Sequence, residues 1–217
     1  MSDIFNEVDE ELRREQFKKL WERYGILIIA LAVLFVAAVG GWRGYQWWEA
    51  KKAAEAGAAF DAAATLSQQG QHQEAEAAFA KIAVEGTPNY RMLAKLREAA
   101  MLAQRDPQAA VAIYDAIAAD RSLDQMQRDL AALRAAYILV DTASYDELKN
   151  RLEPLTASGR PFRHSARSLL ALAAWRANNT AEMRRWIDMV LADPETPTNT
   201  RNQVEMLVAL AGADGKS

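Results

Sequence analysis

The longest apolar stretch of the chain runs from Tyr24 to Trp42, and its nineteen residues include no charged side chain. At ~1.5 Å rise per residue, a helix of this length just spans the ~30 Å hydrocarbon core of a bilayer. A core helix of a small soluble protein rarely runs this long without a polar face. The pattern therefore predicts a single transmembrane helix over residues 24–45.

Amphipathic side chains cluster at both ends of this stretch. Rings that carry a polar atom favour the interface between membrane and water, where the ring is buried and the polar atom stays hydrated. We therefore assign one group of residues to the two membrane interfaces: Trp21, Tyr24, Trp42, Arg43, Tyr45, Trp47 and Trp48.

Basic residues are unevenly divided between the two flanks of the span. Five of them lie between Arg13 and Arg23, whereas Arg43, Lys51 and Lys52 follow the span. Because basic residues favour the cytoplasmic side, we expect a cytoplasmic N-terminus and, for a bacterial inner membrane, a periplasmic C-terminal domain. A cleavable signal peptide is the alternative, but its apolar region is usually about 7 to 15 residues and small residues follow it. Bulky aromatic residues follow here, which favours an uncleaved signal anchor.

Two features of the membrane-proximal region leave their interpretation open. Residues 1–23 predict an amphipathic leader helix, with Ile4, Val8 and Leu12 at helical spacing, which either rests on the inner leaflet or docks a partner. Inside the span, small residues lie four apart in two pairs, Ala37 with Gly41 and Gly40 with Gly44. This spacing permits a close contact with another membrane helix, but glycine and alanine are also common in spans.

Beyond the span, an alanine-rich helical pattern repeats at a period typical of paired-helix solenoids. Segments beginning at Phe60, Leu96, Leu133 and Leu170 align at steps of 36, 37 and 37 residues. An alanine occupies the fourth position of each segment: Ala63, Ala99, Ala136 and Ala173. A small residue is needed where two packed helices cross at close range, so these alanines are expected at helix crossings.

A second set of segments follows the same period. They begin at Ala75, Ala110, Leu148 and Met183, and each carries apolar residues four and seven positions later, as in the second helix of a tetratricopeptide repeat. Pro154 predicts that the second helix of the third unit ends early or kinks. A last helix over residues 199–211 is expected to cap the solenoid with one apolar face: Val204, Leu207, Val208 and Ala211.

These patterns define the expected architecture. The fold class is all-α, with one N-terminal transmembrane helix followed by a tetratricopeptide-like α-solenoid of about four helix pairs plus a C-terminal capping helix. The expected domains are the leader at 1–23, the signal anchor at 24–45, the periplasmic solenoid at 46–211 and a tail at 212–217.

Charge and candidate chemistry exclude several classes of function. After residue 48 the chain has 22 acidic and 20 basic residues, which argues against a surface for nucleic acid. Cysteine is absent. His72 and His164 are 92 residues apart and are expected on the surface. No nucleophile, base and orienting group are clustered as an active site requires. We therefore expect a protein that is not an enzyme, with no catalytic residue, cofactor, metal ligand or small-molecule substrate.

The order of leader, span and solenoid resembles a known family. The residues that carry this resemblance are the leader segment DIFNEVDEELRREQ and the outer boundary G40GWRGYQWW, and they are similar to the YfgM-like ancillary subunits of the SecYEG translocon, in their alphaproteobacterial branch. The resemblance implies a non-enzymatic adaptor or chaperone accessory. Its expected partners are Sec translocon subunits, a membrane-anchored periplasmic chaperone and unfolded secretory substrates. The alternative is a scaffold subunit of another envelope assembly, such as cell division or cytochrome maturation, because such solenoids serve all of these.

Overall fold

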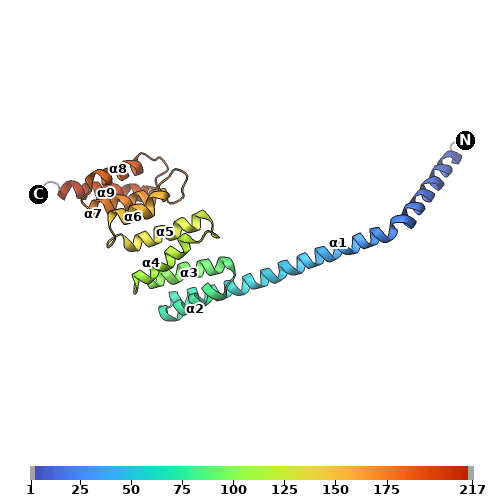
Figure 1. Ribbon diagram of the computed structural model, residues 1–217, viewed down its shortest axis with the longest axis horizontal. Coiled ribbons are helices and arrows are strands. Elements are labelled where there is room, and N and C mark those ends of the chain that lie inside the picture. Colours follow the sequence, from blue (N-terminus) through green and yellow to red (C-terminus); the bar gives the residue numbers. More distant parts are fainter. Residues whose placement is uncertain (1–2, 215–217) are drawn as a thin grey trace. The chain divides into compact units, whose positions relative to one another are not determined.

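The computed structural model describes residues 3–214, with side chains described for Lys18 and for residues 21–212. All regular structure among these residues is helical, which confirms the predicted all-α class (Figure 1). The chain divides into two compact units, Met1–Glu55 and Ala56–Ser217. Helix α1, Asp3–Gln68, contributes residues to both units. The boundaries predicted at residues 23 and 45 fall inside α1 and stay predictions.

The first unit is the N-terminal part of α1. A segment within Trp21–Gln68 is long and apolar enough to cross a membrane. Its apolar side chains between Ile26 and Val39 are exposed, whereas a core helix of a soluble protein buries such side chains. The apolar residues of the predicted leader face, Ile4, Val8 and Leu12, lie outside the residues whose side chains are described.

The second unit is a series of helix pairs that begins with the C-terminal part of α1. Successive helices from α2 to α9 pack against their neighbours in chain order (Figure 1). The pairs are α1 with α2, α3 with α4, α5 with α6, and α7 with α8, and α9 follows as a further helix. Their bounds are α2 His72–Glu85, α3 Pro88–Leu102, α4 Pro107–Ala119, α5 Gln125–Leu139, α6 Tyr145–Leu152, α7 Arg163–Arg176, α8 Thr180–Leu191 and α9 Thr198–Asp214.

Helix starts follow from side chains that accept hydrogen bonds from the free N–H groups of the first turn. Asp106, Ser144 and Asn179 each accept a hydrogen bond from the backbone N–H three residues later, at 3.0, 3.2 and 3.2 Å. A complete capping box lies at α5, where Asp124 and Gln127 exchange hydrogen bonds through side chain and backbone. The connections between helices are therefore short and defined by local chemistry.

The second helix of the third unit ends early, as the position of Pro154 predicts. Helix α6 ends at Leu152, and Pro154 lies in the 3-10 turn η1, Glu153–Leu155. Proline lacks the N–H that an α-helix needs and its ring clashes with the preceding turn, so the α-helix stops early. Leu155 is nevertheless buried, because the 3-10 turn keeps this residue directed at the core.

The repeated alanines occupy the positions that the sequence pattern predicts. Ala63, Ala99 and Ala136 are fully buried and Ala173 is 2% exposed. The apolar residues of the second helices are buried with them, including Phe79, Tyr114, Leu152 and Ile187. Ring packing supports this, since Phe60 meets Phe79 edge to face with ring centroids 5.2 Å apart. The core is not uniform along the solenoid, because the largest cluster joins α5 to α9 and two smaller clusters lie before it.

Two expectations about individual side chains are wrong. His164, expected on the surface, is buried at 8% exposure because it lies under the connection between α8 and α9. Val208, expected on the packed face of the last helix, is 47% exposed, whereas Val204 and Leu207 are buried. Val208 stays open because a groove separates this side of α9 from α8.

Candidate functional site

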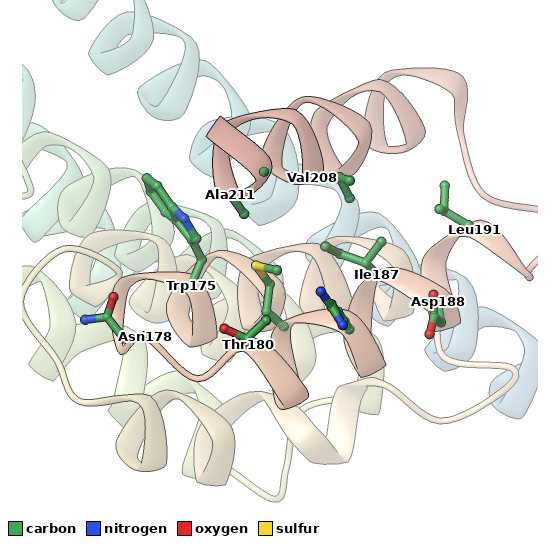
Figure 2. Close-up of a pocket in the computed structure, with 11 residues that line it drawn as sticks. Trp175, Asn178, Thr180, Ile187, Asp188, Leu191, Val208 and Ala211 are labelled. Carbon is green, nitrogen blue, oxygen red and sulfur yellow. The ribbon is translucent and has the colours of Figure 1, made fainter. Parts of the chain in front are cut away.

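A groove of about 600 Å³ opens between α8 and α9, beside the C-terminal end of α7. Figure 2 shows Trp175 at one end of the groove and Leu191 at the other, with Val208 and Ala211 of α9 across from Ile187 of α8. This volume lies within the usual range of ligand-binding clefts, roughly 300 to 1,000 Å³. The lining residues are Trp175, Asn178, Thr180, Met183, Arg184, Ile187, Asp188, Leu191, Val208, Ala211 and Gly212.

The floor of the groove is apolar. Met183 and Ile187 are buried, and both lie at repeated apolar positions of α8, the second helix of the fourth unit. Trp175 is half-buried, so part of its ring faces solvent in the groove. The exposed Val208 continues the apolar surface onto α9. The floor is therefore an apolar surface, and its burial against another molecule would contribute favourable free energy to binding.

The sides of the groove are polar. Arg184 and Asp188 lie one helical turn apart on α8, and Asn178 and Thr180 lie at its beginning. Within the part of the chain whose side chains are described, none of these four side chains forms a hydrogen bond or an ion pair. The neighbouring Arg185, in contrast, pairs with Glu182 at 3.1 Å. The groove thus combines an apolar floor with donors and acceptors that are available to another molecule.

A strip of polar contacts joins the second helices α4, α6 and α8. Between α4 and α6, Arg151 donates to Asp115. Between α6 and α8, Tyr145 donates its hydroxyl hydrogen to Glu182 at 2.5 Å and accepts one from Trp186 Nε1 at 2.9 Å. Burial, reinforced by the hydrogen bond to the Glu182 carboxylate, raises the pKa of Tyr145 to about 12. These contacts align consecutive second helices side by side.

The first helices are also tied to each other. Arg176, which departs from the apolar repeat pattern at the end of α7, donates to the backbone carbonyls of Val140 and Asp141 at the end of α5. The last carbonyls of a helix have no partner within the helix and carry partial negative charge, so an arginine there is favourable. Arg176 therefore joins the third unit to the fourth at the position where the repeat pattern breaks.

A buried ionic cluster positions the connection from α8 to α9. Arg163 Nε and Arg167 Nη1 each lie 3.0 Å from Asp193 Oδ2, and Arg167 also donates to the carbonyls of Thr156 and Met189. Hydrogen bonding to the Arg163 guanidinium holds the pKa of the Asp193 carboxyl well below its usual range. Because every guanidinium nitrogen of the buried Arg167 has an acceptor, its charge is compensated.

His164 completes this cluster. The Thr196 hydroxyl donates to the Val190 carbonyl at 2.7 Å, so it is the acceptor in its 3.0 Å contact with His164 Nδ1. This arrangement requires a hydrogen on Nδ1. Burial lowers the pKa of His164, with the Arg163 charge acting in the same direction. The histidine is therefore a neutral structural group that holds the α8–α9 connection.

The site residues named from the sequence all lie in α1. At the predicted outer interface, Lys51 and Lys52 lie over the rings of Trp47 and Trp48, at 5.7 and 3.6 Å from the ring centroids. A Cβ added at Gly40, Gly41 or Gly44 would meet no other side chain within 4 Å among the described residues, so this helix face is open there. The roles of these residues and of Ala37 in helix contact or at the interface stay predictions.

The groove itself was not predicted. Two sequence features could have indicated it. Trp175 lies in the unit whose apolar pattern is interrupted by Arg176, and the charged residues Arg184 and Asp188 lie next to apolar repeat positions. Among the described residues, no group of three or more histidine, aspartate or glutamate side chains is placed to hold a metal ion.

Comparison with known proteins identifies the repeat. A family model described as a tetratricopeptide repeat-like domain matches residues 18–167. A search of curated proteins and a search of solved structures each find no match. The matched region ends within α7, so the groove residues from Trp175 onward lie beyond it.

Proposed function

This chain belongs to the tetratricopeptide repeat-like domain family, and from that membership we propose that it is a membrane-anchored, non-enzymatic adaptor that binds other proteins. Domains of this family are generally protein-interaction modules without catalytic chemistry. The observation that carries the proposal is the family match over residues 18–167. The groove beside α8 supports it, because its floor is apolar and its polar sides have no partner among the described side chains, which suits a polypeptide ligand.

The proposed anchor is the apolar segment of α1 at residues 24–45. Its support is a helix long and apolar enough to cross a membrane, with exposed apolar side chains and aromatic residues at both ends. The excess of basic residues before the span supports a cytoplasmic N-terminus and a periplasmic solenoid. A tether of this kind confines the solenoid beside other membrane proteins. It can raise the effective concentration to the millimolar range, so weak contacts suffice for binding.

The proposed partners are subunits of the Sec translocon and a membrane-anchored periplasmic chaperone, with unfolded secretory segments as a further ligand. This assignment rests on the resemblance of the leader and of the outer boundary of the span to YfgM-like subunits. Near-neutral charge after residue 48 gives little long-range steering, which increases the expected contribution of the tether to recruitment.

Affinity purification of the full chain from gently solubilised membranes, followed by quantitative mass spectrometry, tests the proposal. Translocon subunits should be enriched over a purification from cells with the untagged protein. Enrichment of cell-division or haem-maturation proteins would instead support the scaffold alternative. If no protein is enriched, the adaptor role is wrong.

The same purification separates the roles of span and solenoid. Replacing residues 24–42 by an unrelated span, or combining Gly40→Leu with Gly44→Leu, should lower partner recovery while the protein stays in the membrane. The open glycine face motivates this expectation, since a leucine there would block close helix contact. Equal recovery from all three proteins would show that the span is only an anchor and that recognition lies in the solenoid.

A further inference from the structure

Helix α9 continues the repeat as the first helix of a fifth unit. A segment that begins at Met206 follows Leu170 at a step of 36 residues, and Ala209 occupies its fourth position, as alanine does in the four preceding units. Val204 and Leu207 are buried in the large core cluster that includes α7 and α8. Helix α9 thus packs on the fourth unit as the first helix of a unit packs on the unit before it.

The opposite face of α9 is uncovered. In α5 and α7, the residues four before the segment start, at the start and three after it are all buried; they are Asp129, Leu133, Ala136, Ala166, Leu170 and Ala173. The residues at the same places in α9 are Asn202, Met206 and Ala209, and all three are exposed, Met206 by 66%. In the third and fourth units, the apolar residues of this face belong to the same core cluster as the buried residues of α6 and α8, the second helices of these units. No helix among the described residues covers it in α9.

The acidic residue that lines the groove, Asp188, also occupies a position that is repeated in earlier units. Asp115, Glu153 and Asp188 each lie five residues after the start of their second-helix segment. Asp115 pairs with Arg151 of the next second helix, and Glu153 lies 4.0 Å from Arg185 of the next one. Asp188 is the third member of this series, and it lines the groove without a partner among the described residues. By analogy with Asp115 and Glu153, a basic residue on a following helix would pair with Asp188.

The basic side chain of the groove follows the same rule with opposite charge. Lys149 and Arg184 each lie one residue after the start of their segment. Lys149 Nζ lies 3.5 Å from Glu182 Oε2 at the beginning of the next second helix. Arg184 is the equivalent residue one unit later and also lines the groove. By analogy with Lys149, an acidic residue in the first turn of a following helix would pair with Arg184.

We propose that an amphipathic helix of a partner protein docks on this end of the solenoid, in the place of the second helix of a fifth unit. Its apolar side covers Met206 and Ala209, which lie on the face of α9 that no described helix covers. An acidic residue in its first turn reaches Arg184, and a basic residue one turn later reaches Asp188. The α6 and α8 helices carry this pattern, with Glu147 or Glu182 directly before the buried Leu148 or Met183 and a basic residue within four positions. The inference rests on the proposed protein-binding function and specifies the class of partner segment.

This surface meets the requirements of recognition of a helix in a groove. Apolar anchors at helical spacing supply most of the affinity in such complexes, and the exposed Met206 with Ala209 provides the complementary surface. The two charges are partly solvated, so they select orientation and register more than they add affinity. Arg184 and Asp188 carry opposite charge one turn apart, which favours one direction of the docked helix.

The test uses a probe of this chemistry and the full chain in detergent micelles. The probe is a fluorescein-labelled peptide with the sequence of residues 178–192, which contains α8, the second helix of the fourth unit. A hydrocarbon staple on its solvent-facing side keeps it helical, since a free peptide of this length is marginally helical in water. Circular dichroism verifies the helix before use. Binding is measured by fluorescence anisotropy.

The peptide should bind the full chain saturably, and Met206→Glu should weaken binding at least tenfold. Met126→Glu is the matched control, because Met126 is an exposed methionine of α5 at 57% exposure and should leave the affinity unchanged. Asp188→Lys should weaken binding of this peptide, and a peptide with Arg185→Glu should recover that loss. A general effect on folding would not produce such a charge-dependent recovery.

Three results would overturn the inference. The verified helical peptide could fail to bind, or Met206→Glu could bind it as tightly as the Met126→Glu control. Native mass spectrometry could also show a dimer that Met206→Glu dissociates, in which case the occupant is a second copy of this chain. If the peptide fails while the full chain and Met206→Glu recover the same partners from membranes, the helix inference is wrong and the adaptor function stands.

Discussion

Ala136→Leu is expected to destabilise the solenoid, because Ala136 lies where α5 crosses its paired helix. Ala136 is fully buried in the largest core cluster, together with Leu148 and Leu152 of α6. A leucine adds three carbon atoms at a position that has no exposed surface and is surrounded by core residues. The helices must separate, or neighbouring side chains must leave their preferred rotamers.

Two opposing effects set the magnitude. Three further buried carbons would contribute about 2.4 kcal/mol at about 0.8 kcal/mol each if they were accommodated. Overpacking of a close-packed core exceeds that gain, and the net destabilisation is typically about 1 to 3 kcal/mol. At about 2 to 4 °C per kcal/mol for a domain of this size, the melting temperature should fall by roughly 2 to 12 °C. Differential scanning calorimetry of the full chain in detergent measures it, and Ala99→Leu should behave alike.

Ala209→Leu is the matched control, because Ala209 has the equivalent position in α9 but is exposed. Its effect should stay within about 0.5 kcal/mol, as for surface substitutions without special contacts. If Ala136→Leu and Ala99→Leu both melt at the wild-type temperature, the helix crossings are not where the repeat register puts them. Equal destabilisation by all three would show that leucine acts through helix propensity or the unfolded chain.

Three further predictions address topology, pH and the polar strip. A reporter that is active only in the periplasm should work when fused after Ser217 and fail when fused before residue 1; the reverse pattern would contradict the proposed orientation. Because burial lowers the folded-state pKa of His164, the unfolded chain binds its proton more readily, so stability should be full above about pH 6.5 and fall as the pH drops toward the lower folded-state value. His164→Gln should flatten this part of the profile of melting temperature against pH, and an unchanged slope would exclude His164 as its source. Tyr145→Phe leaves the Trp186 N–H without its acceptor and should cost about 1 to 3 kcal/mol by urea unfolding, whereas an effect below about 0.5 kcal/mol would mean that water replaces the hydroxyl.

Much of the fold was accessible from local patterns in the sequence. The apolar stretch before Trp42, the spaced alanines and the early stop at Pro154 each act within one or two turns of a helix, so periodicity and propensity reveal them. The crossing positions followed from the repeat, because equivalent residues of successive units meet equivalent neighbours. Burial of Ala63, Ala99 and Ala136 confirms that register.

The candidate site depended on distances between units that no local pattern encodes. The sequence predicts that His164 lies on the surface. In the structure its partner Thr196, 32 residues away, and the α8–α9 connection cover it. Arg176 reads as a break in the repeat until the end of α5, 35 residues or more before it, supplies the acceptors. The groove exists because α9 leaves one side of α8 open, and only the packing of one helix on another decides how far apart two helix faces lie. The sequence by itself therefore determined the helices and the residues at their crossings, while the tertiary structure decided which polar groups are satisfied and which apolar side chains remain exposed.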